Sequence, residues 1–410
     1  MKCRHCASAL SLSFLDLGSA PPSNAYLRPE GLNAPETWYP LRLLVCRQCW
    51  LVQTEDHAGR EALFGDDYAY FSSFSSSWLA HARDYVEAML RRFQLGANSR
   101  VVEVASNDGY LLQYVQRLGV PCYGIEPTAS TAAAAKAKGI TSVERFFGLA
   151  LAEELALAGR QADLMVANNV LAHVPDINDF VAGFARLLKP NGVATFEFPH
   201  LLCMVLGCQF DTAYHEHYSY LSLSAVQRIF AANGLHVFDV QKLTTHGGSL
   251  RVFAQRSDQG RHAVHTAVAE VLAQERDAGM GEPAFYQGFQ AQAIRIRQTL
   301  LSFLLQARQY GLVVAAYGAA AKGNTLLNFA GVRPDLLPYV VDKNPSKQGR
   351  YMPGSRIPVV DEAQLKARRP DRVLILPWNL ATEVKAQLAY IAEWGGLFVT
   401  AVPRLEVVAK

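Results

Sequence analysis

The feature of this sequence that most constrains its fold is a repeated alternation of short buried strands with amphipathic helices. VVEVASNDGYLLQYVQRLG (101–119) reads as a β-branched strand, a small polar turn and a helix, and the next strand ends at the acid Glu126. The pattern continues through ADLMVANNVLAHVPD (162–176) and GVATFEFP (192–199). Strands that alternate with helices predict a parallel, doubly wound α/β sheet, which binds ligands at the carboxyl ends of its strands.

A second unit of the same kind follows a helical stretch over residues 262–310, which is interrupted by glycines and a proline. Its elements are LVVAAYGAAAKGNTLLN (312–328), PYVVDKNPSKQG (338–349) and DRVLILPWN (371–379). Again a buried strand runs into a glycine turn, and a later strand ends at the acid Asp342. We therefore expect two α/β units in one chain.

Four cysteines form two CxxC turns near the start of the chain, Cys3 with Cys6 and Cys46 with Cys49. A CxxC turn points two thiolates at one centre, and two such turns complete the tetrahedral sulfur shell that suits zinc. Redox-active pairs are one alternative, but they need a βαβ context that is absent here; unrelated cysteines are the other. A closed site of four sulfurs has no open position, so its expected role is structural.

Composition narrows the range of partners. The 39 basic and 36 acidic residues give a net charge of only +3, which offers no reason to expect a nucleic-acid or membrane partner. The first residues, MKCRHC, lack the apolar segment of a secretory signal. The longest nearly apolar run, residues 311–321, is too short to span a bilayer. We therefore expect a cytoplasmic protein with reduced thiols.

Two loops are typical of nucleotide sites. EVASNDGY (103–110) lacks the GxGxxG pattern of dinucleotide-binding loops and fits the first loop of an S-adenosylmethionine-binding domain, with Glu126 on the ribose. The alternative is a tight turn of any α/β protein. YGAAAKGN (317–324) places Lys322 where a helix begins, which suits a diphosphate; a packing loop with a solvated lysine is the alternative.

The stretch AYHEHYSY concentrates groups that move protons. In a strand, His215 and His217 would share one face, with Glu216 opposite. A metal site would need a third ligand, whereas imidazole, carboxylate and phenol together suit proton transfer and oxyanion stabilisation. Surface or core histidines are the alternative. His173 follows a strand and is a further candidate, while His246 lies in a glycine turn that favours a structural role.

These motifs together resemble the nucleotide-sugar C-methyltransferases of deoxysugar biosynthesis, including the sugar C-3 methyltransferases. The resemblance covers essentially the whole chain in the same order. It comprises the paired CxxC turns, YxYxSSxSS (68–76), the E-x-x-x-NDG loop, NxLxHxP, FDxxYxEH (210–217), HGGxxR, YGAxAK and PGxxIPV. Ala105 stands where the cofactor loop of this family usually has glycine.

The resemblance implies an α/β protein with an N-terminal zinc-binding module (1–66), a class I, Rossmann-like S-adenosylmethionine-binding domain (67–258) and a second Rossmann-like C-terminal domain for the nucleotide sugar (259–410). The implied cofactors are S-adenosylmethionine and structural zinc. The implied substrate is a small molecule, a TDP-4-keto-6-deoxy sugar, methylated next to its ketone. C-3 is favoured, and C-5 stays an alternative because the AKGNTLLN segment (321–328) departs from the corresponding segment of the C-3 enzymes. We expect a monomer or weak homodimer.

The resemblance also implies residue roles. His217 is the expected base, Glu216 and Tyr214 orient it or stabilise the oxyanion, and His173 lies nearby. The expected cofactor-binding residues are Tyr68, Ser72, Ser73, Glu103, Asn107, Asp108, Gly109, Glu126, Phe147 and Asn168. The expected substrate-binding residues are Tyr70, Lys322, Asn324, Asp342, Lys343 and Trp378. Cys3, Cys6, Cys46 and Cys49 are the expected metal ligands.

Two other functions fit the same sequence. An O- or N-methyltransferase of a nucleotide sugar or another small molecule needs no carbon acid, so it predicts no exchange of a sugar C–H proton with solvent. A zinc-organised protein that binds S-adenosylmethionine or a nucleotide without turnover predicts no loss of function when His217 is replaced. A nucleic-acid methyltransferase is disfavoured because the chain has no basic tract.

Overall fold

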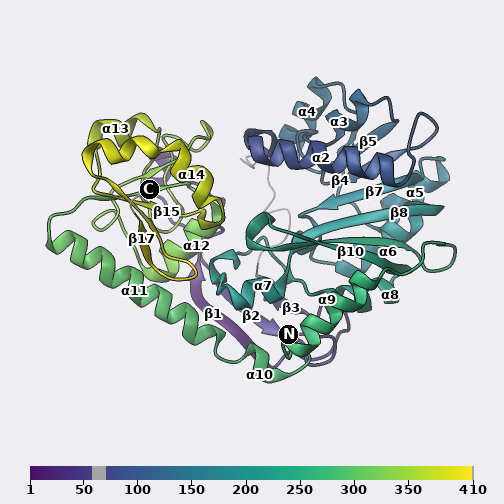
Figure 1. The fold of residues 1–410 in the computed structure, drawn as a ribbon, viewed down its shortest axis with the longest axis horizontal. Coiled ribbons are helices and arrows are strands. Elements are labelled where there is room, and N and C mark those ends of the chain that lie inside the picture. The colour runs from purple at the N-terminus through teal and green to yellow at the C-terminus, as the bar shows by residue number, and fades with distance from the viewer. Residues whose placement is uncertain (58–70, 409–410) are drawn as a thin grey trace.

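A computed structural model describes residues 1–57 and 71–408, which fold around three β-sheets (Figure 1). The first sheet is antiparallel, in the order β1-β2-β3-β9. Its strands are β1 (Leu12–Ala20), β2 (Tyr39–Val45), β3 (Val52–Thr54) and β9 (Ser219–Tyr220). Because β9 comes from far along the chain and pairs with β3, the cysteine-bearing segment is tied to the histidine-rich stretch just before β9.

The second sheet has the order β10-β11-β8-β7-β4-β5-β6. Its strands are β4 (Val101–Val104), β5 (Cys122–Ile125), β6 (Ser142–Val143), β7 (Ala162–Asn168), β8 (Leu188–Pro199), β10 (Leu235–Leu243) and β11 (Ser249–Arg256). The predicted parallel arrangement is confirmed from β8 to β6, but β11 and β10 are antiparallel. The physical reason is the short β10–β11 connection, which permits only a hairpin, whereas a parallel pair needs a crossover.

Helices cover both faces of this sheet, as the alternation predicts. They are α2 (Ser76–Arg92), α3 (Leu112–Arg117), α4 (Ala129–Ala137), α5 (Leu149–Leu157), α6 (Ile177–Leu187), α8 (Leu223–Ala232) and α9 (Thr266–Asp277). One core packs α5, α6, α8 and α9 against one face, and a second packs α2 and α3 against the other. With both faces buried, the carboxyl edge of the strands is left for a ligand.

The third sheet has the order β14-β13-β12-β15-β16-β17 and is parallel except for β17. Its strands are β12 (Val314–Tyr317), β13 (Val340–Val341), β14 (Val359–Val360), β15 (Arg372–Ile375), β16 (Leu397–Thr400) and β17 (Glu406–Val408). The strand order reverses at β12, so the crevice beyond the ends of β12 and β15 is the place where such sheets bind ligands.

The remaining helices connect and cover these sheets. They are α7 (Leu201–Leu206), α10 (Pro283–Tyr286), α11 (Phe289–Gln309), α12 (Ala321–Ala330), α13 (Ala363–Arg368), α14 (Ala381–Gln387) and the 3-10 helices η1 (Pro29–Asn33), η2 (Ser72–Phe74), η3 (Leu171–His173), η4 (Phe210–Thr212), η5 (Thr245–Gly247), η6 (Trp378–Leu380) and η7 (Ala389–Trp394). The predicted interruption of the long helical stretch is confirmed between α9 and α11. Among the described helices, none is long and apolar enough to cross a membrane.

The first and third sheets share one hydrophobic core, which also includes α11. Phe14 of β1 stacks on Phe289 of α11 at a ring-centroid distance of 4.5 Å and meets Tyr286 edge-on at 5.8 Å. Figure 1 shows the two α/β units standing apart, with α11 and the first sheet running beneath them. The N-terminal sheet is therefore part of the framework that joins the two units.

Candidate active site

The four CxxC cysteines meet at one point. Cys3 Sγ lies 3.5 Å from Cys49 Sγ, Cys6 Sγ lies 3.4 Å from Cys46 Sγ, and all four sulfurs lie within 4.8 Å of one another. A tetrahedron of sulfurs around zinc at about 2.3 Å has edges of about 3.8 Å, so these spacings fit the ion. Gln53 supports the cluster by donating its side-chain N–H to Cys3 Sγ at 3.3 Å. Cys3, Cys6, Cys46 and Cys49 are the residues that would hold structural zinc.

The loop after β4 is closed by Glu126, which stands directly after β5. The Glu126 carboxylate accepts hydrogen bonds from the backbone N–H groups of Asn107, at 2.9 Å, and Thr128, at 3.0 Å. Gly109 has a φ of 75°, and a Cβ there would lie 2.4 Å from the Ile140 side chain, so glycine is required at this position. Glu126 thus organises the loop in addition to any contact with ribose that the sequence predicts for it.

Several buried polar atoms beside this loop have no hydrogen-bond partner among the described residues. They include both side-chain atoms of Asn168 at the end of β7, Ser106 Oγ and Asp108 Oδ1. Buried polar atoms are normally paired, so these atoms mark a place where a polar ligand is expected. Burial also raises the pKa of Glu103 well above its usual range. The residues at the ends of β4, β5 and β7 therefore fit a nucleoside-containing cofactor such as S-adenosylmethionine.

The serine-rich segment docks on the same loop. The backbone N–H of Ser72 donates to Asn107 Oδ1 at 3.0 Å. Lys138, which the sequence analysis missed, donates to Ser73 Oγ at 2.9 Å and to Asp108 Oδ2 at 3.1 Å. The structure thus brings together most of the predicted cofactor-binding residues.

The two remaining predicted cofactor-binding residues are Phe147 and Tyr68. Phe147 lies deeper, edge-on to Phe180 and Phe184 in the core. Tyr68 lies outside the described residues, as does Tyr70, which was predicted to bind the substrate.

The histidine-rich stretch is not a strand, which corrects our expectation that His215 and His217 share one face. The His217 backbone N–H donates to Tyr214 O at 2.9 Å, so the chain turns there, and β9 begins only afterwards. Because the chain turns, the alternation of faces does not apply. His215 Nε2 lies 3.3 Å from the carbonyl oxygens of Tyr39 and Pro40, whereas His217 lines a small cavity.

The geometry around His217 determines its tautomer. Its Nδ1 lies 3.0 Å from the Thr212 carbonyl oxygen. A carbonyl can only accept, so Nδ1 carries the proton and Nε2 carries a lone pair. Burial, followed by the neighbouring His173, lowers the His217 pKa well below its usual range. The ring centroids of Tyr214 and His173 lie 3.9 Å and 4.6 Å from that of His217.

Glu216 is buried behind this turn with 1% of its surface exposed. Its Oε1 accepts a hydrogen bond at 3.1 Å from the side chain of Asn24, a residue of the segment between β1 and β2. Burial raises the Glu216 pKa, and hydrogen bonds from the Glu216 backbone and then from the side chain and backbone of Asn24 partly oppose that rise. Burial likewise lowers the His173 pKa to about 4, partly offset by a hydrogen bond with the Glu216 backbone.

The C-terminal unit contributes a second set of groups from the ends of β12 and β15. Trp378 Nε1 donates to Asp211 Oδ2 at 2.7 Å, and Lys322 Nζ lies 4.5 Å from the centre of the Trp378 ring. Burial raises the Asp211 pKa to about 6 and lowers the Lys322 pKa to about 8. The indole packs on Gly247, where a Cβ would lie 2.5 Å from the ring. Motifs from both α/β units therefore meet at this point.

His246, which we expected to be structural, belongs to the same group. Its Nε2 accepts a hydrogen bond from Asn169 Nδ2 at 3.1 Å. Burial, followed by the charge of Lys322, lowers its pKa to about 4. The charge of Lys322 also lowers the pKa of His217, after the larger effects of burial and His173. Asn24, Asp211 and His246 are the polar residues that the sequence analysis failed to assign; the FDxxYxEH and HGGxxR motifs contained a signal for the last two.

The other predicted substrate residues are only partly brought together. Asn324 is buried and donates to Ser23 O at 2.7 Å. Asp342 accepts from the Asn344 backbone N–H at 2.8 Å. Lys343 is exposed, and the structure gives it no contact with the histidine group. Lys343 therefore stays a prediction without structural support.

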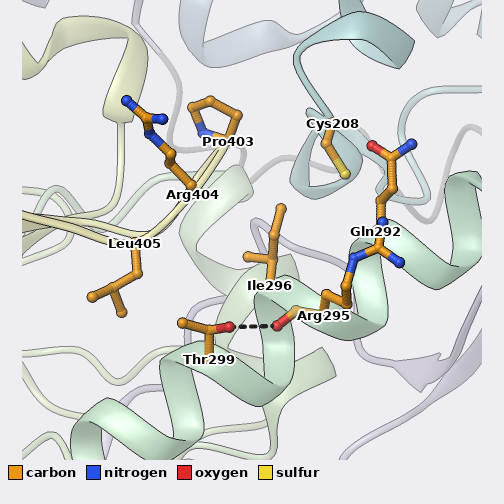
Figure 2. A pocket seen from close by; sticks show the side chains of 8 residues that line it. All are labelled: Cys208, Gln292, Arg295, Ile296, Thr299, Pro403, Arg404 and Leu405. Atoms are coloured by element: carbon orange, nitrogen blue, oxygen red, sulfur yellow. Dashed lines mark hydrogen bonds between the residues drawn. The ribbon is translucent and has the colours of Figure 1, made fainter.

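Two cavities lie among the described residues. A small one, about 20 Å³, is lined by His217, Thr212 and Tyr220. A larger one, about 320 Å³, lies between α11, the segment after β16 and Cys208 (Figure 2). Figure 2 shows Arg295 and Arg404 on opposite sides of it. None of the residues predicted for catalysis lines the larger cavity, so the catalytic group is distinct from it.

Comparison with known proteins identifies the family. Family models match a zinc binding domain over residues 3–64, a methyltransferase domain over 78–240 and a C-methyltransferase C-terminal domain over 244–403. C-methyltransferase NovU of Streptomyces niveus is 34% identical over 408 residues, which cover 100% of this chain and 97% of the relative. The chain belongs to the C-methyltransferases. This C-methyltransferase is an S-adenosylmethionine-dependent enzyme with a zinc-binding N-terminal domain.

Part of the enzyme is also similar to other methyltransferases. A ubiquinone biosynthesis O-methyltransferase of Bradyrhizobium sp. (strain ORS 278) is 29% identical over 154 residues, which cover 31% of this chain and 58% of the relative. Among solved structures, the 1,6-didemethyltoxoflavin-N1-methyltransferase of Burkholderia thailandensis matches with a TM-score of 0.37 and 15% identity, covering 51% of this chain and 96% of its own. Magnesium protoporphyrin IX methyltransferase of Synechocystis PCC 6803 matches with a TM-score of 0.35 and 18% identity, covering 44% and 85%.

Proposed function

We propose that this enzyme methylates the carbon next to the ketone of a TDP-4-keto-6-deoxy sugar, with C-3 favoured over C-5. The observation that carries the proposal is the fixed tautomer of His217, whose Nδ1–H is held by the Thr212 carbonyl while Nε2 keeps its lone pair. O- and N-methylation need no base for a C–H bond, whereas C-methylation next to a ketone does.

In the proposed reaction, His217 Nε2 removes the proton from the carbon next to the ketone. Its lowered pKa keeps the ring neutral, and therefore able to accept a proton, at physiological pH. When bound, S-adenosylmethionine would supply the methyl group for the new C–C bond, and the methyl–sulfur bond would break to leave S-adenosylhomocysteine. General-base assistance of this kind contributes roughly 10²–10⁴-fold to a rate.

Tyr214 and His173 flank the base and are suited to bind the developing enolate oxygen. The ring centroids of both residues lie within 4.6 Å of that of the His217 ring, so both side chains lie beside the base. Glu216 belongs to the same turn as His217, and its carboxyl group accepts a hydrogen bond from Asn24. Preorganised donors aimed at an oxyanion in a buried site stabilise the transition state more than they do in water.

The nucleotide end of the substrate is assigned to the crevice beyond β12 and β15. Lys322 offers a positive charge there, beside the N-terminus of α12, which suits a diphosphate. The partly buried Trp378 ring offers an apolar face next to it. Trp378 also contacts Asp211 and packs on Gly247 of the first α/β unit, so a diphosphate bound at Lys322 would lie at the junction of the two α/β units.

The test is mass spectrometry of TDP-4-keto-6-deoxy sugars incubated with the enzyme in D₂O, with and without S-adenosylmethionine. We expect one methyl group to be gained with the cofactor, and deuterium uptake at the same carbon without it. His217→Asn should abolish both, because asparagine can still donate to Thr212 O but has no basic nitrogen. His215→Asn is the matched control and should retain both. Methyl gain without any exchangeable sugar C–H would instead indicate O- or N-methylation.

A further inference from the structure

A short segment of the zinc-binding domain, residues 21–27 between β1 and η1, lies between the two α/β units. Asn324 of α12 donates to Ser23 O at 2.7 Å, and Tyr26 donates its hydroxyl to Ala319 O at 2.5 Å. Leu27 pairs with Tyr351 through backbone hydrogen bonds of 3.0 Å and 2.8 Å. The segment is therefore bound to the loop and helix that follow β12 and to the connection between β13 and β14.

On its other side the same segment reaches the catalytic turn. Asn24 Nδ2 donates to Glu216 Oε1 at 3.1 Å, and its backbone N–H also acts on this carboxylate. Glu216 is almost completely buried, and its Oε2 has no hydrogen-bond partner among the described residues. Asn24 is thus the side chain that supplies a hydrogen bond to this carboxyl group.

A buried carboxyl group with so few donors is sensitive to each of them. Removing a partner from a buried charged group costs more than an ordinary hydrogen bond, because the group is left without solvent or a substitute. A donor to a carboxylate favours its ionised form and fixes the direction of its oxygens. The direction of Glu216 in turn affects the position of Tyr214 and His217, because all three belong to one tight turn.

We propose that Asn24 is a positioning residue of the methyl-transfer site, which orients the Glu216 carboxylate so that the zinc-binding domain completes the active site. This role rests on the proposed function of the Glu216–His217 turn. The N-terminal domain then has two tasks: its cysteines hold the fold of the module, and its 21–27 segment forms a wall of the catalytic site.

The test compares Asn24→Ala and Asn24→Asp with Asn33→Ala, a matched control on the exposed part of the same domain. Infrared difference spectra between each protein and its Glu216→Gln counterpart follow the ionisation of Glu216 with pH and need no substrate. Tyr26 and Tyr220 interact with the Glu216 carboxyl group, and His173 makes a hydrogen bond with the Glu216 backbone; these three groups are unchanged in all variants. Zinc content and melting temperature report on the fold.

We expect Glu216 to ionise at a higher pH in Asn24→Ala and at a higher pH still in Asn24→Asp, which adds a negative charge. With substrate, kcat should fall roughly tenfold to a hundredfold, as expected for losing a hydrogen bond to a buried charge. The acid limb of its pH profile should move upward, while the dissociation constant of S-adenosylmethionine stays unchanged. Asn33→Ala should match the wild type in every measurement.

An unchanged Glu216 titration in both Asn24 variants would overturn the proposal, and so would an equal loss of activity at every pH. Failure of the wild type to methylate 4-keto sugars would contradict the proposed substrate instead, because the infrared titration is independent of it. If Asn24→Ala loses zinc or melts early, Asn24→Gln, which retains the amide, separates positioning from folding: restored Glu216 ionisation supports the proposal, and its absence refutes it.

Discussion

Individual residues in strained conformations surround the candidate site. Ala105, Asn107, Asn169 and His246 have φ values of 55°, 50°, 56° and 56°, in the left-handed region that favours glycine. They lie after β4, after β7 and between β10 and β11, where ligands are expected. Each costs roughly 1–2 kcal/mol for an L-residue without a compensating contact. Of the ten described residues other than glycine with a positive φ, these four lie in loops of the candidate site.

Ala105→Gly should stabilise the enzyme. Glycine adopts a positive φ without strain but is more flexible when unfolded, so we expect a net gain of up to about 1 kcal/mol in the free energy of unfolding, measured with urea. Ala133→Gly, on the exposed face of α4, is the control and should lose about 1 kcal/mol. Equal destabilisation of both variants would show that Ala105 is not strained.

Asp211 should make stability depend on pH. Its pKa rises from 3.8 to about 6 on folding, so the native state binds more protons than the unfolded state within that window. The free energy of unfolding should therefore fall as pH rises from 4 to 6. Relative to wild type, Asp211→Asn should gain on the order of 3 kcal/mol between pH 4 and pH 7. Denaturant unfolding at both pH values measures this, and the exposed Asp335→Asn should show no such difference.

Among the elements, loops at the carboxyl ends of strands carry most of the residues predicted to bind the cofactor and the nucleotide. The β4–α3 loop and the β5 end meet through Glu126, and the β7 end adds Asn168. The β12 and β15 ends add Lys322 and Trp378. Parallel strands end at one edge, so residues distant in sequence become neighbours there.

Glu126→Ala should weaken cofactor binding far more than sugar binding. The mutation removes the acceptor for two backbone N–H groups of the loop and the predicted ribose contact, so a loss of roughly tenfold or more in S-adenosylmethionine affinity is expected. Titration calorimetry with each ligand measures the two affinities. Glu153→Ala, on an exposed position of α5, should change neither. Equal losses for both ligands would argue against the assignment of Glu126 to the cofactor.

At the scale of the whole molecule, the N-terminal sheet connects the four-cysteine cluster to the turn that carries His217. β3 pairs with β9, and Thr54 donates its hydroxyl to the backbone oxygen of His217 at 3.0 Å. The same sheet shares its core with α11 and the third sheet. A disturbance of the zinc site should therefore reach the base as well as the fold.

Cys46→Ser should lower the zinc content, destabilise the enzyme and reduce methyl transfer together. Serine is a poor zinc ligand, and three thiolates do not close a tetrahedral shell. Metal analysis, thermal unfolding and activity measure the three effects. Cys122→Ser, at a cysteine outside the cluster, should keep its full zinc content. A full complement of zinc in Cys46→Ser would contradict the four-cysteine site.

Much of this protein follows from sequence alone. The alternation of strands and helices predicted two α/β units, because the periodicity of apolar residues is a local property of each element. The CxxC spacing predicted the sulfur cluster for a similar reason: each turn sets the direction of its own two thiols. The assignment of the histidine-rich stretch to catalysis and of Lys322 to the substrate rests on residue type and stays a prediction.

Only the tertiary structure decided how these pieces meet. The histidines of AYHEHYSY lie in the connection between η4 and β9, where the chain turns, whereas the sequence analysis considered them in a strand. Three interactions join residues that lie far apart in the chain. Asn24 donates a hydrogen bond to Glu216, Trp378 donates one to Asp211, and the charge of Lys322 acts on His246. No local pattern encodes such contacts, because they arise from the shared burial of segments that are far apart in the chain. Local propensity therefore determined the elements, and burial between them determined the site.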